Sequence, residues 1–345
     1  MKIGIIGGGI SGLYSAHLLS KDHDVTIFEG NHWGGDIHHT YIEDKCHPIS
    51  TLFVMPHDLL LKEELKNINA TTQYTNYPPI YSIIVILLTI SVTGINFLNS
   101  SGNLKYAYAT IILLIIFFAV LYFYNSICFY KLSFGETDVC SLTRYSDLFN
   151  KSFIFDSIKF VENCGFSKLV DFYRSNPKIT YVSSNVIKVC YENVYPHIQV
   201  YTNSSDYLFD KIIIACPYDS YSKIMNLDQD ENIILSNLRY FDFYSTLVKF
   251  ANKNQNPNNI DGVIGAHQQD DAYLCASHKP LDIKYQTVFK KQYKWKMPIY
   301  TDVDQKQLIN LLPNRKTYFI GKEVTINGVN YCMEYAKKIA QLITT

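Results

Sequence analysis

The chain opens with a short apolar strand that runs directly into a glycine-rich turn. Residues Ile3–Ile6 form the predicted strand, and the turn places glycines at Gly7, Gly9 and Gly12. Gly7 permits a tight turn, Gly9 lets the backbone approach a pyrophosphate, and Gly12 lets the following helix pack against the strand. Ser11 lies in the first turn of that helix, whose amide groups would point at the phosphates. The pattern predicts a dinucleotide-binding turn.

The residues after this helix support the same interpretation. Val25–Phe28 reads as a second strand, and Glu29 follows it directly. A carboxylate at this position would accept hydrogen bonds from the ribose hydroxyls of an adenosine. The alternative is a glycine-rich turn in an unrelated fold, but the order of strand, glycines, helix, strand and acid favours a nucleotide site.

Length and charge limit the class of protein. With 345 residues the chain can form two packed domains, each with its own core. The formal net charge is +0 and no basic run occurs, so we expect no nucleic-acid partner. The chain begins at the strand, without the charged and apolar regions of a signal peptide, so we expect no cleaved leader and a cytosolic nucleotide-binding part.

The cysteines and histidines indicate neither a zinc site nor another metal site. The eight cysteines include no C-x-x-C pair and are expected to be reduced thiols. Four histidines lie close together between positions 32 and 47. His38 and His39 are adjacent and would point in opposite directions on a strand, so they could not easily bind one ion. We predict a loop in which one or two of these histidines face a ligand, or in which they are simply solvated.

The N-terminal residues carry a family resemblance. The glycine turn, Glu29 and the Gly34–Gly35 pair together resemble the flavin-containing amine oxidase superfamily, which includes amine oxidases, protoporphyrinogen oxidase, phytoene desaturase and UDP-galactopyranose mutase. The resemblance implies that Gly34 and Gly35 let the backbone pass close to an FAD. The gap from Glu29 to Gly34 is one residue shorter than is usual in the family. The customary arginine near the glycine pair is absent, and His32 and Asp36 stand nearby.

The middle and the end of the chain extend the resemblance. The strand-like run 179–189 matches the place of the family's adenine-contacting valine, which implies that Val186 has this role. Near the C-terminus, a strand ends at Gly321 and Glu323, and the helix that follows contains Met333. In the family the strand-end acid holds the ribityl hydroxyls and the helix N-terminus faces the flavin pyrimidine. A positive helix end would stabilise the negative charge of a reduced flavin.

Two residues are candidates for the chemistry. Lys249 lies between Val248 and Phe250 in an apolar strand, where an ammonium needs water or a partner. The resemblance implies that Lys249 holds a water beside flavin N5, and the alternative is a lysine that extends its stem to solvent. Trp295, in the loosely matching run from Tyr293, would lie where the substrate domain returns to the flavin.

A second feature of the sequence is a long uncharged segment. Asn67–Leu104 and Tyr106–Tyr130 contain no Asp, Glu, Lys or Arg, and Lys105 separates them. As a helix, Tyr106–Tyr130 would be about 37 Å long, enough to cross a hydrocarbon core. Together with the milder run Ile80–Leu98 it predicts a transmembrane hairpin. The alternative is a buried helical pair in the substrate domain.

These observations predict an α/β fold with a discontinuous Rossmann-like FAD-binding domain and a mixed α+β substrate domain, into which the apolar helical hairpin is inserted. The predicted FAD domain comprises residues 1–66, 161–240 and 314–345. The hairpin comprises 67–131, and the substrate domain comprises 132–160 and 241–313.

The resemblance implies an FAD-dependent oxidoreductase that moves a hydride from a substrate to flavin N5. Because both ends of the hairpin return to the FAD domain, we expect that domain on one face of a membrane. Lys62, Lys66 and Lys131 flank the hairpin on that side and favour the cytosolic face. We expect a lipophilic substrate, such as a long-chain amine, an isoprenoid or a sterol-like molecule. The alternatives are a non-redox mutase of the UDP-galactopyranose type, which would need arginines where the chain has only four, and a flavin-binding protein without catalysis. An NAD dehydrogenase would not explain the Gly321–Glu323 strand end.

Overall fold

The computed structural model describes residues 1–50, 53–55, 57–74, 159–191, 197–235, 238–298, 307–311, 315–325 and 328–345. A parallel sheet lies at the centre, in the order β17-β12-β1-β2-β8. Its strands are β1 (Lys2–Ile6), β2 (Asp24–Phe28), β8 (Ile179–Val182), β12 (Lys211–Ile214) and β17 (Thr317–Phe319). The prediction of a Rossmann-like α/β fold is confirmed, and its central sheet is parallel.

The sheet is assembled from segments far apart in sequence. In β1, Ile5 pairs with Ile27 of β2 on one side and with Ile213 of β12 on the other. These three side chains are fully buried. Parallel strands covered on both faces read as continuous apolar runs, which explains the three consecutive isoleucines of β12.

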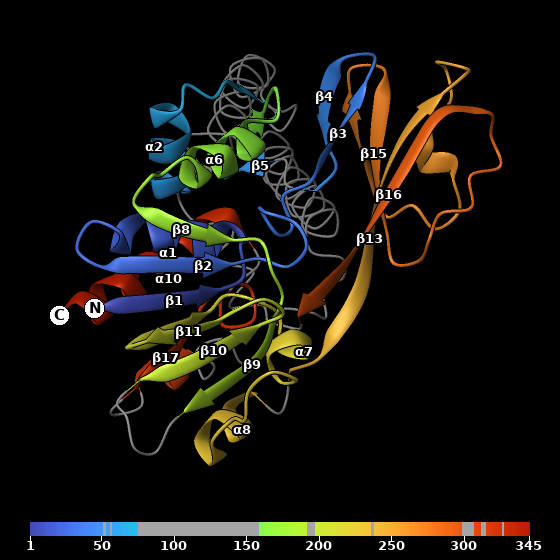
Figure 1. Ribbon diagram of the computed structural model, residues 1–345. Helices are drawn as coiled ribbons and strands as arrows, with labels where there is room; N and C mark the ends of the chain where they lie inside the picture. The colour runs from blue at the N-terminus through green and yellow to red at the C-terminus, as the bar shows by residue number, and fades with distance from the viewer. Residues whose placement is uncertain are drawn as a thin grey trace, which may run out of the picture.

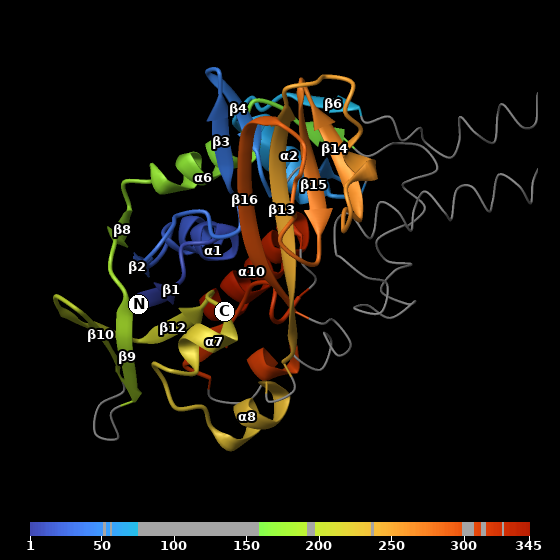
Figure 2. The same ribbon diagram turned by 90° about the vertical axis from the view of Figure 1, so that its right-hand side faces the viewer.

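Four helices pack against one another beside the sheet: α1 (Ile10–Leu19), α2 (Leu59–Asn67), α6 (Gly165–Arg174) and α10 (Val329–Thr344). Eight of the ten residues of α1 are buried, because the helix lies between the sheet, α6 and α10. Figure 2 shows these helices on one side of β1 and an antiparallel sheet, β9-β10-β11, on the other.

This antiparallel sheet corrects one expectation from the sequence. The run 179–189 does not form one strand: β8 ends at Val182 and β9 (Val186–Tyr191) pairs with β10 (Ile198–Thr202), which pairs with β11 (Asp206–Phe209). Phe28 of the central sheet packs edge-on against Phe209, with ring centroids 5.8 Å apart. The chain therefore leaves one sheet and enters the other within three residues, 183–185.

A second antiparallel sheet, β14-β15-β13-β16, stands apart from the parallel sheet at the right of Figure 1. Its strands are β13 (Tyr240–Phe250), β14 (Gly265–Gln269), β15 (Ala272–Ser277) and β16 (Thr287–Pro298), and the hairpin β3 (His39–Ile42) and β4 (Lys45–Pro48) rises beside it. Smaller elements are β5 (Phe53–Val54), β6 (Thr72–Tyr74), β7 (Lys159–Val161), α7 (Tyr218–Tyr221), α8 (Gln229–Leu235) and short 3-10 helices at Pro257–Asn259 and Leu308–Leu311.

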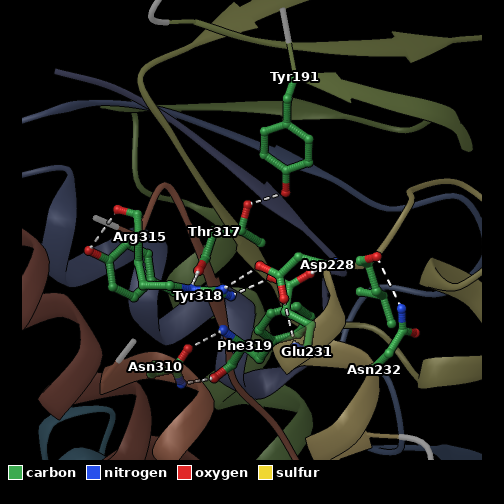
Figure 3. A network of polar contacts seen from close by, with 10 residues as sticks. Tyr191, Asp228, Glu231, Asn232, Asn310, Arg315, Thr317, Tyr318 and Phe319 are labelled. Carbon is green, nitrogen blue, oxygen red and sulfur yellow. Dashed lines mark hydrogen bonds and ion pairs between the residues drawn. The ribbon is translucent and has the colours of Figure 1, made fainter. Parts of the chain in front are cut away.

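A polar network fixes the edge strand β17 (Figure 3). The Asn310 side chain forms two hydrogen bonds with the Phe319 backbone: its Nδ2 donates to the Phe319 carbonyl at 2.6 Å, and its Oδ1 accepts from the Phe319 amide at 2.7 Å. Arg315 donates to the buried Glu231 of α8 at 2.6 Å and to the Thr317 carbonyl at 3.0 Å. Buried charges need partners of this kind. The network positions the chain that continues to Gly321.

A disulfide links two further parts of the structure. Cys46 of β4 is bonded to Cys164, which precedes α6, across 118 residues of sequence. The expectation that all cysteines are reduced thiols is therefore wrong for this pair. Cys190, Cys216 and Cys275 are not in disulfides.

The predicted apolar hairpin falls largely outside the described residues. Within its range of 67–131, Asn67 ends α2 and Thr72–Tyr74 forms β6, so these residues do not belong to a hairpin of apolar helices. Residues 75–131, with both predicted spans, lie outside the described part of the chain, as do 132–158 of the predicted substrate domain. Over the described ranges, no helix is both long and apolar enough to cross a membrane.

Candidate functional site

One cavity of about 640 Å³ lies where the strands of the parallel sheet end. Gly7 follows β1, Glu29 follows β2, Cys216 follows β12 and Gly321 follows β17, and all four line it. The opposite wall comes from the four-stranded sheet, including Trp295 of β16. Ligands of open α/β sheets bind at this edge, and the volume suits a sizeable ligand.

The glycine turn has the geometry that the sequence predicts. Gly7 has φ +115°, a conformation that L side chains rarely adopt. A Cβ on Gly12 would clash with the Gly7 carbonyl oxygen, so this glycine permits close packing of α1 against β1. Gly12 does not line the cavity. Its role is packing, as the motif predicts.

Gly34 and Gly35 lie directly against the same turn. The Gly34 amide donates to the Gly8 carbonyl at 2.8 Å. A Cβ on Gly35 would lie 3.0 Å from the Cα of Gly9, whereas the nearest atom to a Cβ on Gly9 is the Gly35 Cα at 3.8 Å. The space beside Gly9 is therefore open to the cavity, as a closely approaching ligand requires.

Glu29 holds the backbone around the cavity. Its Oε2 accepts from the Gly8 amide at 2.7 Å, and its Oε1 accepts from the amides of Asn31 at 2.7 Å and His32 at 3.2 Å. A carboxylate offers about four acceptor positions, so Oε2 retains capacity for a ligand hydroxyl. Val186 and its neighbour Asn185 line the cavity beside Gly30.

The C-terminal strand brings a second acid to the cavity. Glu323 is 6% exposed, and burial raises the pKa of its carboxyl group. The Tyr240 hydroxyl donates to Glu323 Oε1 at 3.4 Å. Because the carboxyl group has little water around it, a hydroxyl-rich ligand in the cavity could add hydrogen bonds to it.

Lys322 forms an ion pair inside the cavity. Its ammonium lies 2.7 Å from Asp36 Oδ2, and both residues line the wall. Burial would lower the pKa of Lys322, but the carboxylates of Asp36 and Glu323 raise it. The lysine is therefore charged, and it joins residues that are 286 positions apart.

Most of the predicted cofactor residues surround this one cavity. Nine of the eleven line it: Gly7, Gly9, Ser11, Glu29, Gly34, Gly35, Val186, Gly321 and Glu323. Gly12 does not, and Met333 is fully buried in the core of α10. The neighbour of Met333, Cys332, lines the cavity instead.

The far end of the cavity is apolar and aromatic. Trp295 packs edge-on against Phe243 and Tyr293, with ring centroids 6.1 and 5.9 Å away. The Trp295 Nε1 is buried and has no hydrogen-bond acceptor among the described residues. A buried indole N–H normally finds a partner, so this donor is an unsatisfied polar group in the wall of the cavity.

Two histidines at this end are uncharged at neutral pH. Burial, together with the neighbouring His32, lowers the pKa of His38 to about 4, and burial alone lowers that of His267 to about 4. The His38 ring stacks on His32 at 4.3 Å and lies against Tyr293 at 3.9 Å. His32, His38 and His267 all line the cavity, so of the two alternatives for the loop histidines the structure places His32 and His38 beside the cavity.

Sequence reasoning missed Asp58. This residue precedes α2, lines the cavity and is 5% exposed. Its Oδ2 accepts from the Met55 amide at 2.8 Å, and burial raises the pKa of its carboxyl group to about 7. An aspartate before a helix reads as an ordinary N-cap, so nothing local signals that this one faces a cavity.

The structure does not bring Lys249 to the site. Its ammonium lies 2.6 Å from Glu43 Oε1 and 2.8 Å from Asp271 Oδ2, and its side chain does not line the cavity. The partners that the Lys249 ammonium needs are thus two carboxylates from turns at the surface. This placement corrects the assignment of Lys249 as a residue beside flavin N5. In the described part of the chain, no group of three or more His, Cys, Asp or Glu side chains is arranged to hold a metal ion.

Comparisons with known proteins agree with this geometry. Residues 5–53 match the model of the NAD(P)-binding Rossmann-like domain. No curated protein matches the chain in sequence.

Solved structures share the fold over the whole chain. The fatty acid isomerase from P. acnes that produces CLA has a TM-score of 0.65 at 11% identity, covering 99% of this chain and 98% of its own. A protoporphyrinogen oxidase candidate from Exiguobacterium sp. 255-15 gives the same values. Wild-type putrescine oxidase bound to putrescine has a TM-score of 0.61 at 11% identity and covers 100% of both chains. The fold implied by the family resemblance is confirmed.

Proposed function

We propose that the chain is an FAD-dependent oxidoreductase of the amine oxidase type. The observation that carries this proposal is the convergence of Gly9, Glu29, Gly35 and Glu323 on one cavity beside the N-terminus of α1. The first three come from the N-terminal segment and the last is residue 323 of 345. A dinucleotide requires a backbone cradle and acids for its hydroxyl groups, and these residues supply both.

The residues present fit the cofactor. The open space at Gly9 would receive the diphosphate, Glu29 would hold the adenosine ribose, and Glu323 would hold the ribityl hydroxyls. When bound, the flavin would accept a hydride from a substrate carbon, and molecular oxygen or another acceptor would reoxidise it. The residues of the chain supply binding, orientation and exclusion of water.

The apolar end of the cavity favours a lipophilic substrate. Phe243, Leu274, Tyr293 and Trp295 form much of this end, and the uncharged His38 adds no cation. Such a surface would bind an apolar chain or ring, and the buried Trp295 N–H would reach a polar atom of the substrate after a small shift of the surrounding side chains. Arginines that a nucleotide-sugar diphosphate would require are missing among the described residues that line the cavity, which argues against the mutase.

Two measurements test the proposal. The purified full-length protein should show a flavin absorption spectrum, and denaturation should release FAD. Anaerobic mixing with lipophilic amines or isoprenoids should bleach that spectrum if the protein is an oxidoreductase. A colourless protein that takes up no FAD would refute the proposal, and bound FAD that no substrate reduces, although dithionite does, would favour the non-catalytic alternative.

We also propose that residues 80–98 and 106–130 anchor the protein in a membrane with the FAD domain on the cytosolic face. The support is the absence of charge in these runs and the lysines that flank them, Lys62, Lys66 and Lys131. The Cys46–Cys164 disulfide is a reason to test the face directly, because disulfides are rare in cytosolic proteins. Carbonate extraction tests the anchor, and recovery of intact protein in the supernatant would refute it. Protease protection of sealed vesicles tests the face.

A further inference from the structure

Acidic side chains outnumber basic ones around the cavity. Four carboxyl groups line it, from Glu29, Asp36, Asp58 and Glu323. Lys322 is the only lysine or arginine among the described residues that do so. A dinucleotide would add the two negative charges of its diphosphate. The N-terminus of α1 offers only partial positive charge, which leaves Lys322 as the full cation.

The position of Lys322 relates it to the glycine turn. A Cβ on the preceding residue, Gly321, would lie 3.8 Å from Ser11 Oγ in the first turn of α1. The Lys322 ammonium reaches Asp36, which follows Gly35, and Gly35 packs on Gly9. The ion pair therefore links a residue that follows the neighbour of Ser11 to a residue that follows the neighbour of Gly9. The Lys322 side chain is 11% exposed, so a charge brought to this turn would be poorly screened by water.

We propose that Lys322 is the counter-ion of the dinucleotide diphosphate, and that its ammonium is shared between a phosphate oxygen and the Asp36 carboxylate. This inference rests on the proposed function, because it assumes a dinucleotide in the cavity. The ammonium would donate to a phosphate oxygen while it keeps Asp36 as a second acceptor, since it has three donor hydrogens. The competing interpretation is a brace that only ties the C-terminal loop to the Gly34–Gly35 loop.

Ligands that carry different parts of FAD separate these interpretations. Full-length protein, freed of bound flavin, is titrated by calorimetry with FAD, with ADP as a diphosphate without flavin, and with riboflavin as flavin without phosphate. Lys322→Met should weaken binding of FAD and of ADP by about tenfold to a hundredfold, as expected for a charge-assisted hydrogen bond. Riboflavin binding should stay within about twofold, since riboflavin lacks the ADP part of FAD and therefore has no phosphate for Lys322 to contact. Lys322→Arg should restore most of the ADP affinity.

Two variants complete the design. Asp36→Asn removes a carboxylate that competes with phosphate, so ADP binding should be unchanged or tighter. Lys294→Met is the matched control: it breaks an ion pair of the same 2.7 Å length, with Asp242, on a half-exposed lysine that does not line the cavity. All three ligands should bind this control as they bind the wild type.

The outcomes are distinct. Equal loss of ADP affinity in Lys322→Met and Asp36→Asn would show a brace and overturn the inference, as would wild-type ADP affinity in Lys322→Met. If Lys322→Met does not fold, the direction of the change in Asp36→Asn decides: a weakened ADP affinity overturns the inference. A wild-type protein that binds neither FAD nor ADP would refute the proposed function itself. If the wild type binds FAD and Lys322→Met binds it with the same affinity, this inference alone is refuted.

Discussion

The Cα atom of Gly35 lies 3.8 Å from the position that a Cβ on Gly9 would occupy, at the floor of the cavity. Gly9 itself has φ −69° and ψ 174°, which any residue can adopt. The protein alone therefore does not require glycine at position 9. A ligand that approaches the backbone there would require it.

This relationship predicts that Gly9→Val folds but does not take up FAD. The added methyl groups would occupy the space of the diphosphate, so we expect loss of flavin from the purified variant with a melting temperature close to that of the flavin-free wild type. Absorption spectra and thermal unfolding measure the two effects.

Gly12→Val is the contrasting variant. Its Cβ would meet the Gly7 carbonyl oxygen, so this change should prevent stable folding. If Gly9→Val retains FAD at wild-type stoichiometry, the diphosphate does not lie where we propose.

The buried Asp58 predicts a pH dependence of stability. In the unfolded chain an aspartate ionises near pH 4, whereas burial raises the pKa of Asp58 to about 7 in the folded protein. Between these values the folded state binds the proton more tightly, so the stability that this carboxyl group contributes is complete below about pH 4 and is lost as the pH rises to about 7.

Asp58→Asn should remove this dependence, because the amide oxygen can still accept from the Met55 amide but does not titrate. Relative to the wild type, the variant should gain on the order of a few kcal/mol of unfolding free energy between pH 4 and pH 8. Chemical denaturation at both pH values measures it, with Asp206→Asn, an exposed change, as the control. A constant difference between the two proteins would contradict the prediction.

The Cys46–Cys164 disulfide should stabilise the fold. It closes a loop of 118 residues and ties β4 to the start of α6. Reducing it, or replacing both cysteines with alanine, should cost about 2–5 kcal/mol of unfolding free energy. Thermal unfolding with and without a reductant measures this loss. The melting temperature of Cys190→Ala should still fall when reductant is added, whereas that of the double variant should not change. A wild-type protein whose melting temperature does not change with reductant would argue against the disulfide.

How much the sequence predicts depends on whether the relevant contacts are local. The turn from Gly7 to Gly12 and the acid at Glu29 belong to one strand–helix–strand unit. Their spacing therefore predicts both which residues meet the ligand and where they lie, and the structure places them as expected. The β8 and β9 strands read as one run because the polar residues 183–185 between them do not interrupt the apolar pattern strongly.

The missed features are long-range contacts. Asp36 and Lys322 are 286 residues apart, and nothing in either neighbourhood indicates the other. The disulfide is equally hidden, because eight cysteines allow 105 complete pairings and sequence alone does not choose among them. Asp58 resembles an ordinary helix cap. Its burial comes from the packing of α2 against α10, which the sequence of α2 does not encode.

Lys249 shows the same limitation and leads to the last prediction. Val248 and Phe250 are buried, so the lysine between them reads as an ammonium in an apolar setting. In the structure the β3–β4 turn and the β14–β15 turn bring Glu43 and Asp271 to it. Lys249→Met should therefore leave FAD content and the rate of flavin reduction unchanged, because the side chain does not reach the cavity.

Trp295→Phe provides the comparison, because it preserves an aromatic ring while it removes the buried N–H that has no acceptor among the described residues. If that N–H holds the substrate, the substrate concentration for half-maximal flavin reduction should rise roughly tenfold, as expected for a hydrogen bond of about 1.4 kcal/mol. Stopped-flow reduction of the bound flavin measures both variants under one set of conditions. Slower reduction in Lys249→Met together with wild-type behaviour in Trp295→Phe would assign the chemistry to the lysine and require its loops to move, because in the present arrangement two carboxylates hold its ammonium away from the cavity.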